Sequence, residues 1–217
     1  MKTVEKGGEF LARVFGTSTE NAVGLLGDKL EYWRWERQIR MIDKVNEYQK
    51  ERGLRITRPI PPKFAIPMIT NASLEEDNDL QEMWCKLIIN ALDYNFKSEI
   101  RFAYIDIIKS LTSLDAKILK FVYDAVYNKL KSEGKNTINI EMAKISLNLE
   151  DLNDRISGSE EELLINFNNL MRVQCLRNPS LENAVYVENE ITIFKKGGKM
   201  RVALTPLGIA FIEVCIK

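Results

Sequence analysis

The sequence has no histidine among its 217 residues. Histidine is the side chain that most often transfers protons near neutral pH, and it is the commonest metal ligand. Its absence removes the usual general base, the usual zinc ligand besides cysteine, and every Ser-His-Asp or Cys-His catalytic arrangement. We therefore expect a protein that is not an enzyme and that holds no metal or cofactor.

Cysteine is scarce as well. Cys85, Cys175 and Cys215 stand far apart, each among apolar neighbours, and none has the C-x-x-C spacing of a zinc or redox site. An odd number of widely separated thiols is typical of buried core cysteines and not of a disulfide framework. The pattern predicts free thiols and favours a reducing cytoplasm.

The chain also lacks a net charge, a long apolar run and a phosphate-binding glycine motif. Lys and Arg number 31, as do Asp and Glu, so the long-range field is weak and does not indicate a polyanionic partner. No window approaches the roughly 18 apolar residues of a membrane span, and charges interrupt the segment from Met1 to Phe15, so neither a transmembrane helix nor a signal peptide is predicted. The glycine pairs match no nucleotide-binding pattern, so no small-molecule substrate is expected.

Residues 1–111 carry apolar side chains at helical spacing and give no strand signal. Prolines at 59, 61, 62 and 67 indicate a stiff connection into a short helix, and Ser73-Leu74-Glu75-Glu76 has the spacing of a capping box. Five helices are predicted. The first ends at Phe15, the second runs from about Glu20 to Arg52, and the third has Pro62 near its first turn. The fourth begins after Ser73, and the fifth covers 99–111. We expect an all-helical N-terminal region whose long second helix bears the tryptophans.

Residues 112–217 mix helix and strand signals. A helix from Thr112 or Ser113 to about Lys131 is followed by a short β-leaning segment at 137–140, a brief helix at 149–156 and a longer one at 159–172. Two strands, at 184–194 and 200–204, flank a glycine turn, and Thr205-Pro206 begins a final helix. Helix, tight turn, longer helix and hairpin is the order of a winged helix. The sequence predicts a mainly α fold, with a winged-helix domain over 112–217.

Several short stretches, taken in order, resemble the bacterial abortive-infection alpha family. They are GDKLEYWRW at 27–35, PPK at 61–63, ASLEED at 72–77, LQEMW at 80–84, NALD at 90–93, LDAKIL at 114–119 and LTPLG at 204–208. The resemblance extends from about residue 20 to 217. It implies a bacterial or prophage protein of phage defence, and it supplies no catalytic residue.

The segment around Trp33, Arg34, Trp35 and Arg37 is the first candidate interaction site. From Lys29 to Arg58 there are nine basic and five acidic residues, a balance of +4. Aromatic residues interleaved with arginines are found on nucleic-acid-binding and membrane-surface helices. The commoner reading is that the tryptophans are core or interface anchors and that the arginines form ion pairs.

The second helix of the predicted helix-turn-helix begins with Glu160, Glu161 and Glu162. Because such residues would face DNA phosphates, these carboxylates disfavour DNA binding by this helix. The predicted hairpin offers Lys195, Lys196, Lys199 and Arg201 as candidate nucleic-acid contacts, or as lysines that keep a hairpin tip solvated.

One further cluster is acidic: Glu75, Asp79 and Glu82 fall on one helical face, but no second carboxylate cluster accompanies them, and a metal site is not expected. We expect a non-enzymatic interaction protein of phage defence that binds a protein partner or a copy of itself. Two alternatives remain at this stage. One is a DNA-binding regulator that uses the basic hairpin, and the other is a membrane-surface effector that uses amphipathic helices between Phe10 and Trp35.

Overall fold

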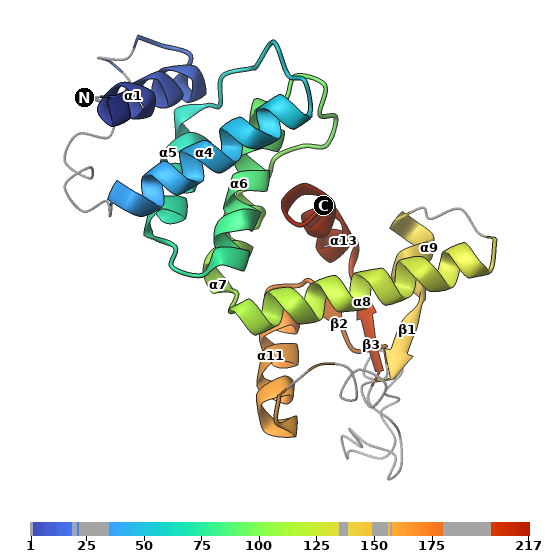
Figure 1. Ribbon diagram of the computed structural model, residues 1–217. Coiled ribbons are helices and arrows are strands. Elements are labelled where there is room, and N and C mark those ends of the chain that lie inside the picture. The colour runs from blue at the N-terminus through green and yellow to red at the C-terminus, as the bar shows by residue number, and fades with distance from the viewer. Residues whose placement is uncertain are drawn as a thin grey trace, which may run out of the picture. The chain divides into compact units, whose positions relative to one another are not determined.

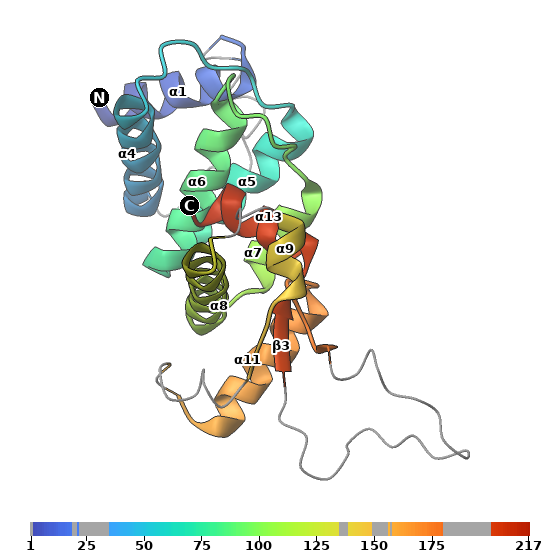
Figure 2. The ribbon, with the colours of Figure 1, turned by 90° about the vertical axis from the view of Figure 1, so that its right-hand side faces the viewer.

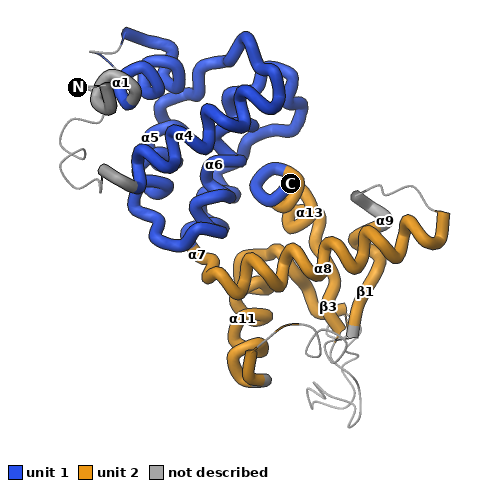
Figure 3. The backbone as a smooth tube through the Cα atoms, viewed as in Figure 1, with its two compact units in different colours: residues 1–109, 214–217 blue, residues 110–213 orange. Residues whose placement is uncertain are grey.

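The computed structural model describes residues 2–18, 21, 35–134, 139–148, 156, 158–179 and 201–217. Two compact units are present, as Figure 3 shows. Unit 1 consists of Met1–Lys109 with Val214–Lys217, and unit 2 consists of Ser110–Glu213. The described chain is mainly helical, with a small three-stranded antiparallel sheet.

Unit 1 is a layered arrangement of helices (Figure 1). Its helices are α1 (Lys2–Phe15), α4 (Trp35–Glu51), α5 (Pro62–Leu74), α6 (Asn78–Leu92) and α7 (Phe102–Ser110), the last residue of which belongs to unit 2. Helix α4 packs on α6 and α5, α5 packs on α6, and α1 covers α4 and α5. Their shared core is fully buried, and its largest members include Phe10, Met41, Met68, Trp84 and Leu87.

Most helix ends in unit 1 lie where the sequence predicts them. Helix α1 ends at Phe15 and is followed by Gly16, whose φ is +63°. Gly53, with φ +61°, follows the end of α4, and Pro62 is the first residue of α5. Left-handed φ is a conformation that glycine adopts without strain, which is why these two positions stop a helix. The predicted start of the long second helix, at about Glu20, lies outside the described residues, as do residues 22–34.

The prediction of a helix beginning after Ser73 is wrong. Ser73 lies inside α5, and its hydroxyl donates to the carbonyl of Thr70. Helix α6 begins at Asn78, with Asp77 as its N-cap, and the carboxylate of Asp77 accepts from the backbone N–H groups of Asp79 and Leu80. A carboxylate is a strong acceptor at the positive end of a helix, so Asp77 determines the boundary.

Unit 2 is built on the long helix α8, which Figure 1 shows from the side and Figure 2 nearly along its axis. Its elements are α8 (Ser113–Ser132), α9 (Asn139–Lys144), β1 (Ser146–Asn148), α11 (Glu160–Arg172), β2 (Leu176–Arg177), β3 (Arg201–Leu204) and α13 (Pro206–Cys215), whose last two residues belong to unit 1. The strand order is β1-β3-β2, with Leu147 opposite Val202 and Leu176 opposite Leu204. Helix α8 contacts α9, α11, β1 and β3.

Three helix starts in unit 2 are confirmed. Thr112 caps α8 and forms a complete capping box with Asp115. Ser159 caps α11 through a bond from the Glu162 N–H, and the Thr205 hydroxyl accepts from the Gly208 N–H at the start of α13. In each case a hydroxyl satisfies a backbone donor that the first helical turn leaves free.

The strand predictions for unit 2 were less accurate. Residues 139 and 140 were predicted to lean toward β structure, but they are helical and belong to α9. This helix contacts α8 and β3, and its Met142 is buried. Strand β3 was predicted, whereas β1 and β2 were missed. Residues 135–138, 149–155 and 180–200, which include the first predicted hairpin strand and most of the predicted brief helix, lie outside the described residues.

The three cysteines are free and buried, as predicted. Burial raises the pKa of the Cys85 and Cys175 thiols to about 12, so both are protonated and unreactive at neutral pH. Among the described helices, none combines the length and the apolar content needed to cross a bilayer.

Candidate interaction surfaces

Of the four residues in the tryptophan-arginine segment, Arg37 is the one whose side chain the structure describes. Trp33 and Arg34 lie outside the described residues, as does the side chain of Trp35, the first residue of α4. The Nη2 atom of Arg37 lies 2.6 Å from Glu76 Oε1, and its Nη1 atom donates to the carbonyl of Leu74 at 3.2 Å. Arg37 therefore links α4 to the connection between α5 and α6.

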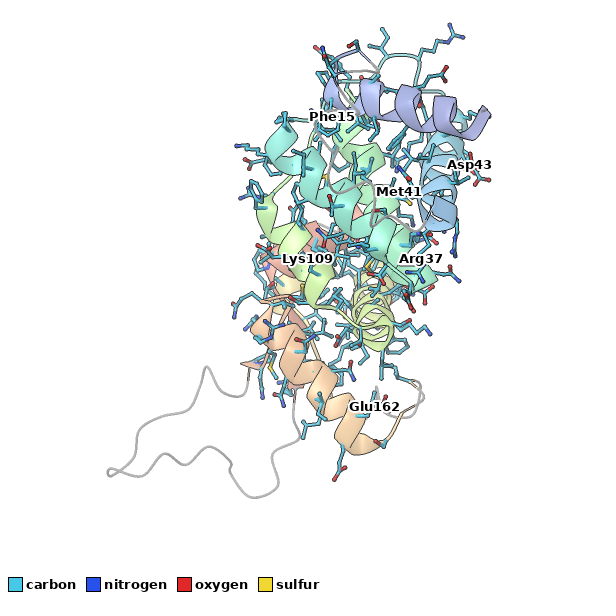
Figure 4. All side chains as sticks on the ribbon, turned by 90° about the vertical axis from the view of Figure 1, so that its left-hand side faces the viewer. Phe15, Arg37, Met41, Asp43, Lys109 and Glu162 are labelled. Carbon is cyan, nitrogen blue, oxygen red and sulfur yellow. The ribbon has the colours of Figure 1, made fainter. Side chains whose placement is uncertain are left out.

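Two more cations of α4, Arg40 and Lys44, and Arg52 just after its end also bond to residues of α6. Arg40 donates to Asn78 Oδ1 at 2.5 Å, Lys44 lies 3.3 Å from Glu82, and Arg52 donates to Asn90 Oδ1 at 2.6 Å. Arg37, Arg40 and Lys44 are three and four residues apart, so they form a single stripe along the side of α4, and Arg52 follows two turns later. In Figure 4, Met41 is directed into the unit and Asp43 lies on the outer side of α4. The stripe holds two helices together and is not a free basic surface.

Glu82 is the centre of this polar seam. It accepts from Tyr48 at 3.2 Å and pairs with Lys44 and Lys86, at 3.3 Å and 3.2 Å. Burial opposes ionisation of Glu82, but hydrogen bonds from Lys86 and Lys44 outweigh it, so its pKa is lowered. Burial, together with the charge of Glu82, raises the pKa of Tyr48. Glu82 is thus a paired carboxylate at neutral pH, and the arrangement acts as a structural ion-pair network.

Two of the acidic residues near the start of α6 form contacts within the protein. Glu75 Oε1 accepts from the backbone N–H groups of Glu76 and Asp77, and Glu76 pairs with Arg37. Within the part of the chain that the structure describes, no group of three or more Cys, Asp or Glu side chains could hold a metal ion. Glu75, Asp79 and Glu82, which share one helical face, therefore do not form such a group.

Unit 1 has an open hollow of about 910 Å³ beside the C-terminal half of α4. Charges of both signs line it, among them Arg13, Asp43, Glu47 and Lys50. Arg13 donates to Asn46 Oδ1 at 2.6 Å and lies over the ring of Phe10. Pockets that bind small molecules are mostly apolar with a few convergent polar groups, so this hollow does not have the character of one.

The apolar residues of α1, which the membrane-surface alternative requires, face the protein interior. Phe10, Leu11, Val14 and Phe15 are all buried, and α1 contacts α4 and α5. A helix that binds the surface of a bilayer must present its apolar face to lipid. In this structure that face is already covered by unit 1.

Helix α11 presents an acidic and apolar surface. Glu161 and Glu162 are exposed in its first turn, and Glu162 is labelled in Figure 4. Leu164 and Ile165, which follow them, are 43% and 69% exposed. Sequence reasoning identified the glutamates but missed the exposure of these two apolar residues. The sequence could have indicated this exposure, because three consecutive residues such as Leu163, Leu164 and Ile165 point in different directions around a helix and cannot all be buried against one neighbour.

The basic hairpin residues are represented by Arg201 alone. Lys195, Lys196 and Lys199 lie outside the described residues. Arg201 is the first residue of β3; it is exposed, and it lies opposite Asn148 of β1. Of the four candidate nucleic-acid contacts, the structure therefore describes one, which lies at the start of β3.

A buried polar cluster fixes α11 against α8. Asp115, which is fully buried, accepts through Oδ2 from the Thr112 N–H, the Thr112 hydroxyl and Asn169 Nδ2, at 2.8, 3.0 and 2.8 Å. Asn166 Oδ1 lies 3.0 Å from the Thr112 hydroxyl oxygen, whose one proton it shares with Asp115, and Asn169 also donates to the Ser110 carbonyl. Among the described residues, Asp115 Oδ1 has no hydrogen-bond partner. These contacts orient α11 so that Leu163, Phe167 and Leu170 are buried and its opposite face is exposed.

The comparisons with known proteins give one family. The model of the abortive infection alpha family matches residues 36–215, which is most of the chain. No curated protein and no solved structure matches the chain significantly. The matched range covers the α4–α6 seam of unit 1 and the elements of unit 2 up to Cys215. On this evidence the chain belongs to the abortive infection alpha family.

Proposed function

We propose that this chain is a non-enzymatic component of phage defence that acts by binding another protein or a copy of itself. Membership of the abortive infection alpha family suggests the role in phage defence. Helix α11 suggests the mode of action, because its exposed apolar residues Leu164 and Ile165 lie beside exposed carboxylates, a combination suited to a protein partner.

We further propose that unit 2 is a winged-helix domain. The order α8, α9, β1, α11, β2, β3 supports this, with an antiparallel sheet in which β3 lies between β1 and β2. In a winged helix, the last helix before the hairpin is the one that DNA-binding members insert into the major groove. By its place in the chain, α11 corresponds to that helix.

The observation that carries the proposal is the chemistry of the exposed α11 face. Glu161 and Glu162 occupy the end that would approach the phosphates, and Leu164 and Ile165 follow them. A DNA-binding surface neutralises several phosphates with Lys and Arg, whereas carboxylates repel them. Exposed apolar residues bordered by charges are typical of a protein-binding surface.

A DNA-binding regulator is the second candidate. Its support is Arg201, exposed at the start of β3, together with the lysines at 195, 196 and 199 in the sequence. Such a protein would bind through the basic segment and not through α11. Binding would be weak and would fall steeply as salt rises, because the contacts would be to phosphates.

The two candidates are separated by measuring both DNA binding and defence. The purified chain is titrated with a generic DNA duplex at low salt, and phage plating is scored in cells expressing wild type or Ile165→Asp. Absence of duplex binding, with defence lost in Ile165→Asp, supports a protein partner at α11. Salt-sensitive duplex binding that Lys195→Glu with Lys196→Glu abolishes, with defence unchanged in Ile165→Asp, would replace our proposal with the regulator.

A further inference from the structure

The outer face of α11 has an order of residues that suits pairing with itself. Glu161, Ile165, Asn168 and Arg172 are spaced by four, three and four residues, so they form one stripe along the helix. All four side chains are exposed, whereas Leu163, Phe167 and Leu170 on the opposite side are buried. The stripe is the centre of the solvent-facing side of the helix.

The charges at the two ends of this stripe form no ion pair with the residues that the structure describes. Neither Glu161 nor Glu162 forms an ion pair with any residue that the structure describes. The same holds for Arg172, whose guanidinium donates instead to the neutral side chain of Asn169, one turn earlier. Between these ends lies Ile165, 69% exposed, with Leu164 beside it.

We propose that α11 is a self-association surface, on which α11 of a second copy of the chain packs antiparallel. This inference rests on the proposed function and names the partner. Reversing one helix against the other brings Glu161 of each copy to the partner's Arg172, so two equivalent ion pairs close the ends of the contact. In this register Ile165 of each copy lies opposite Asn168 of the partner and less than one helical turn from the partner's Ile165, so both apolar side chains leave water near the centre. The same patch serves both copies, as a two-fold interface requires.

The helix dipoles favour the same arrangement. The carboxylates of Glu161 and Glu162 lie at the positive end of their own helix, and Arg172 lies at the negative end. In an antiparallel pair, each positive helix end also lies beside the negative end of the partner's helix. A parallel pair would instead place glutamates against glutamates and arginine against arginine, so the charges select one direction.

The chemistry of the face disfavours other occupants. DNA and an anionic membrane surface would both be repelled by Glu161 and Glu162. A basic peptide would satisfy the glutamates but would leave Arg172 facing a like charge. A single helix face of 13 residues is small beside standard interfaces, so the dimer is expected to be weak and sensitive to salt.

The test is a charge swap in the full-length chain, followed by sedimentation equilibrium over a range of concentrations at low salt. Wild type should approach twice the mass of one chain as concentration rises. Glu161→Arg and Arg172→Glu should each weaken self-association by at least about tenfold, because each leaves like charges facing each other. An equimolar mixture of the two variants should restore the dimer, because the two faces are then complementary.

Two controls make the experiment decisive. Asp124→Arg reverses an exposed charge on α8, away from the stripe, and should leave association unchanged. Circular dichroism checks that each variant is folded. A wild-type chain that stays monomeric at the highest concentration, or single variants that associate as wild type does, would overturn the self-association surface. If that happens while Ile165→Asp still abolishes defence, the proposed function stands with a different partner.

Discussion

Gly208 packs against the main chain of Cys175 so closely that a Cβ atom at position 208 would lie 2.1 Å from the Cys175 carbonyl oxygen. The contact joins the first turn of α13 to the residues that follow α11. The Thr205 N–H donates to the same carbonyl at 3.1 Å, and the Thr205 hydroxyl donates to the carbonyl of Gln174. The first turn of α13 therefore packs directly on the backbone of the residues that follow α11, and no side chain fits between them at position 208.

Gly208→Ala should strongly destabilise unit 2. The clashing atoms belong to the backbone and cannot rotate away, so α13 must shift, at a cost of about 3 kcal/mol or more. Urea unfolding followed by circular dichroism measures the change. Gly7→Ala is the matched control, because a Cβ there would meet nothing within 4 Å and alanine favours a helix. Equal stability of Gly208→Ala and wild type would show that the contact is looser than described.

Gln174→Gly should stabilise the protein by about 0.5–1 kcal/mol. Gln174 has φ +59°, a left-handed conformation that is strained for a residue with a side chain. It follows the end of α11, where the Cys175 N–H bonds to the Leu170 carbonyl and the Gln174 N–H bonds to the Met171 carbonyl, which is the Schellman motif that glycine usually completes. The midpoint of thermal or urea unfolding reports the gain. Gln174→Ala keeps the strain and should give none, so a similar gain in both variants would rule out this cause.

Asp115→Asn should lower the free energy of unfolding by about 1–2 kcal/mol. The amide oxygen can replace Oδ2 as acceptor for Thr112 and Asn169, but the amide N–H groups would then be buried at the Oδ1 position, where no described residue offers a partner. Asp124→Asn, exposed on the same helix, is the control and should be neutral. Denaturant titrations of both variants at pH 7 test the prediction, which fails if their midpoints coincide.

Glu82→Gln should remove a small stabilisation that depends on pH. The pKa of Glu82 is lowered in the folded state, so its contribution is present above the unfolded pKa, near 4.3, and is lost as pH falls through the folded value. Because Glu82 is partly exposed, we expect a difference below about 1 kcal/mol at pH 7 that shrinks toward pH 3. Unfolding titrations at both pH values measure it. The exposed Glu47→Gln serves as control, and a difference from wild type that grows on acidification would contradict the assignment.

The sequence was informative where structure depends on neighbouring residues. Helix caps at Thr112, Ser159 and Thr205 were predicted because each hydroxyl acts on a backbone group within three residues. Helix stops at Gly16 and Gly53 follow from the same local chemistry. The wrong start after Ser73 shows the limit of this reasoning, because two capping sequences lie close together and only packing of α5 decides between them.

Ion pairs of the arginines were expected, but partners that lie far away in the sequence were not predicted. Arg37 pairs with Glu76, 39 positions away, and Asp115 bonds to Asn169, 54 positions away. Strands β1 and β2 are short, and each exists by pairing with β3, so neither has a pattern long enough to detect. The exposure of Leu164 and Ile165 depends on which side of α11 packs on α8. Periodicity alone does not identify that side, because apolar residues occur on more than one face of this helix.

The central position of β3 bears on how the protein emerges from the ribosome. Of the three described strands, β3 is the last to be synthesised, and β1 and β2 each pair with it and not with each other. Unit 1 likewise includes Val214–Lys217, where the carbonyls of Val214 and Ile216 accept from Asn90 and Lys86. A nascent chain that has not yet exposed the segment from Arg201 onward thus lacks the pieces that complete both units. Premature termination upstream of that segment would release a polypeptide with unpaired strand edges, the kind of species that chaperones and proteases remove.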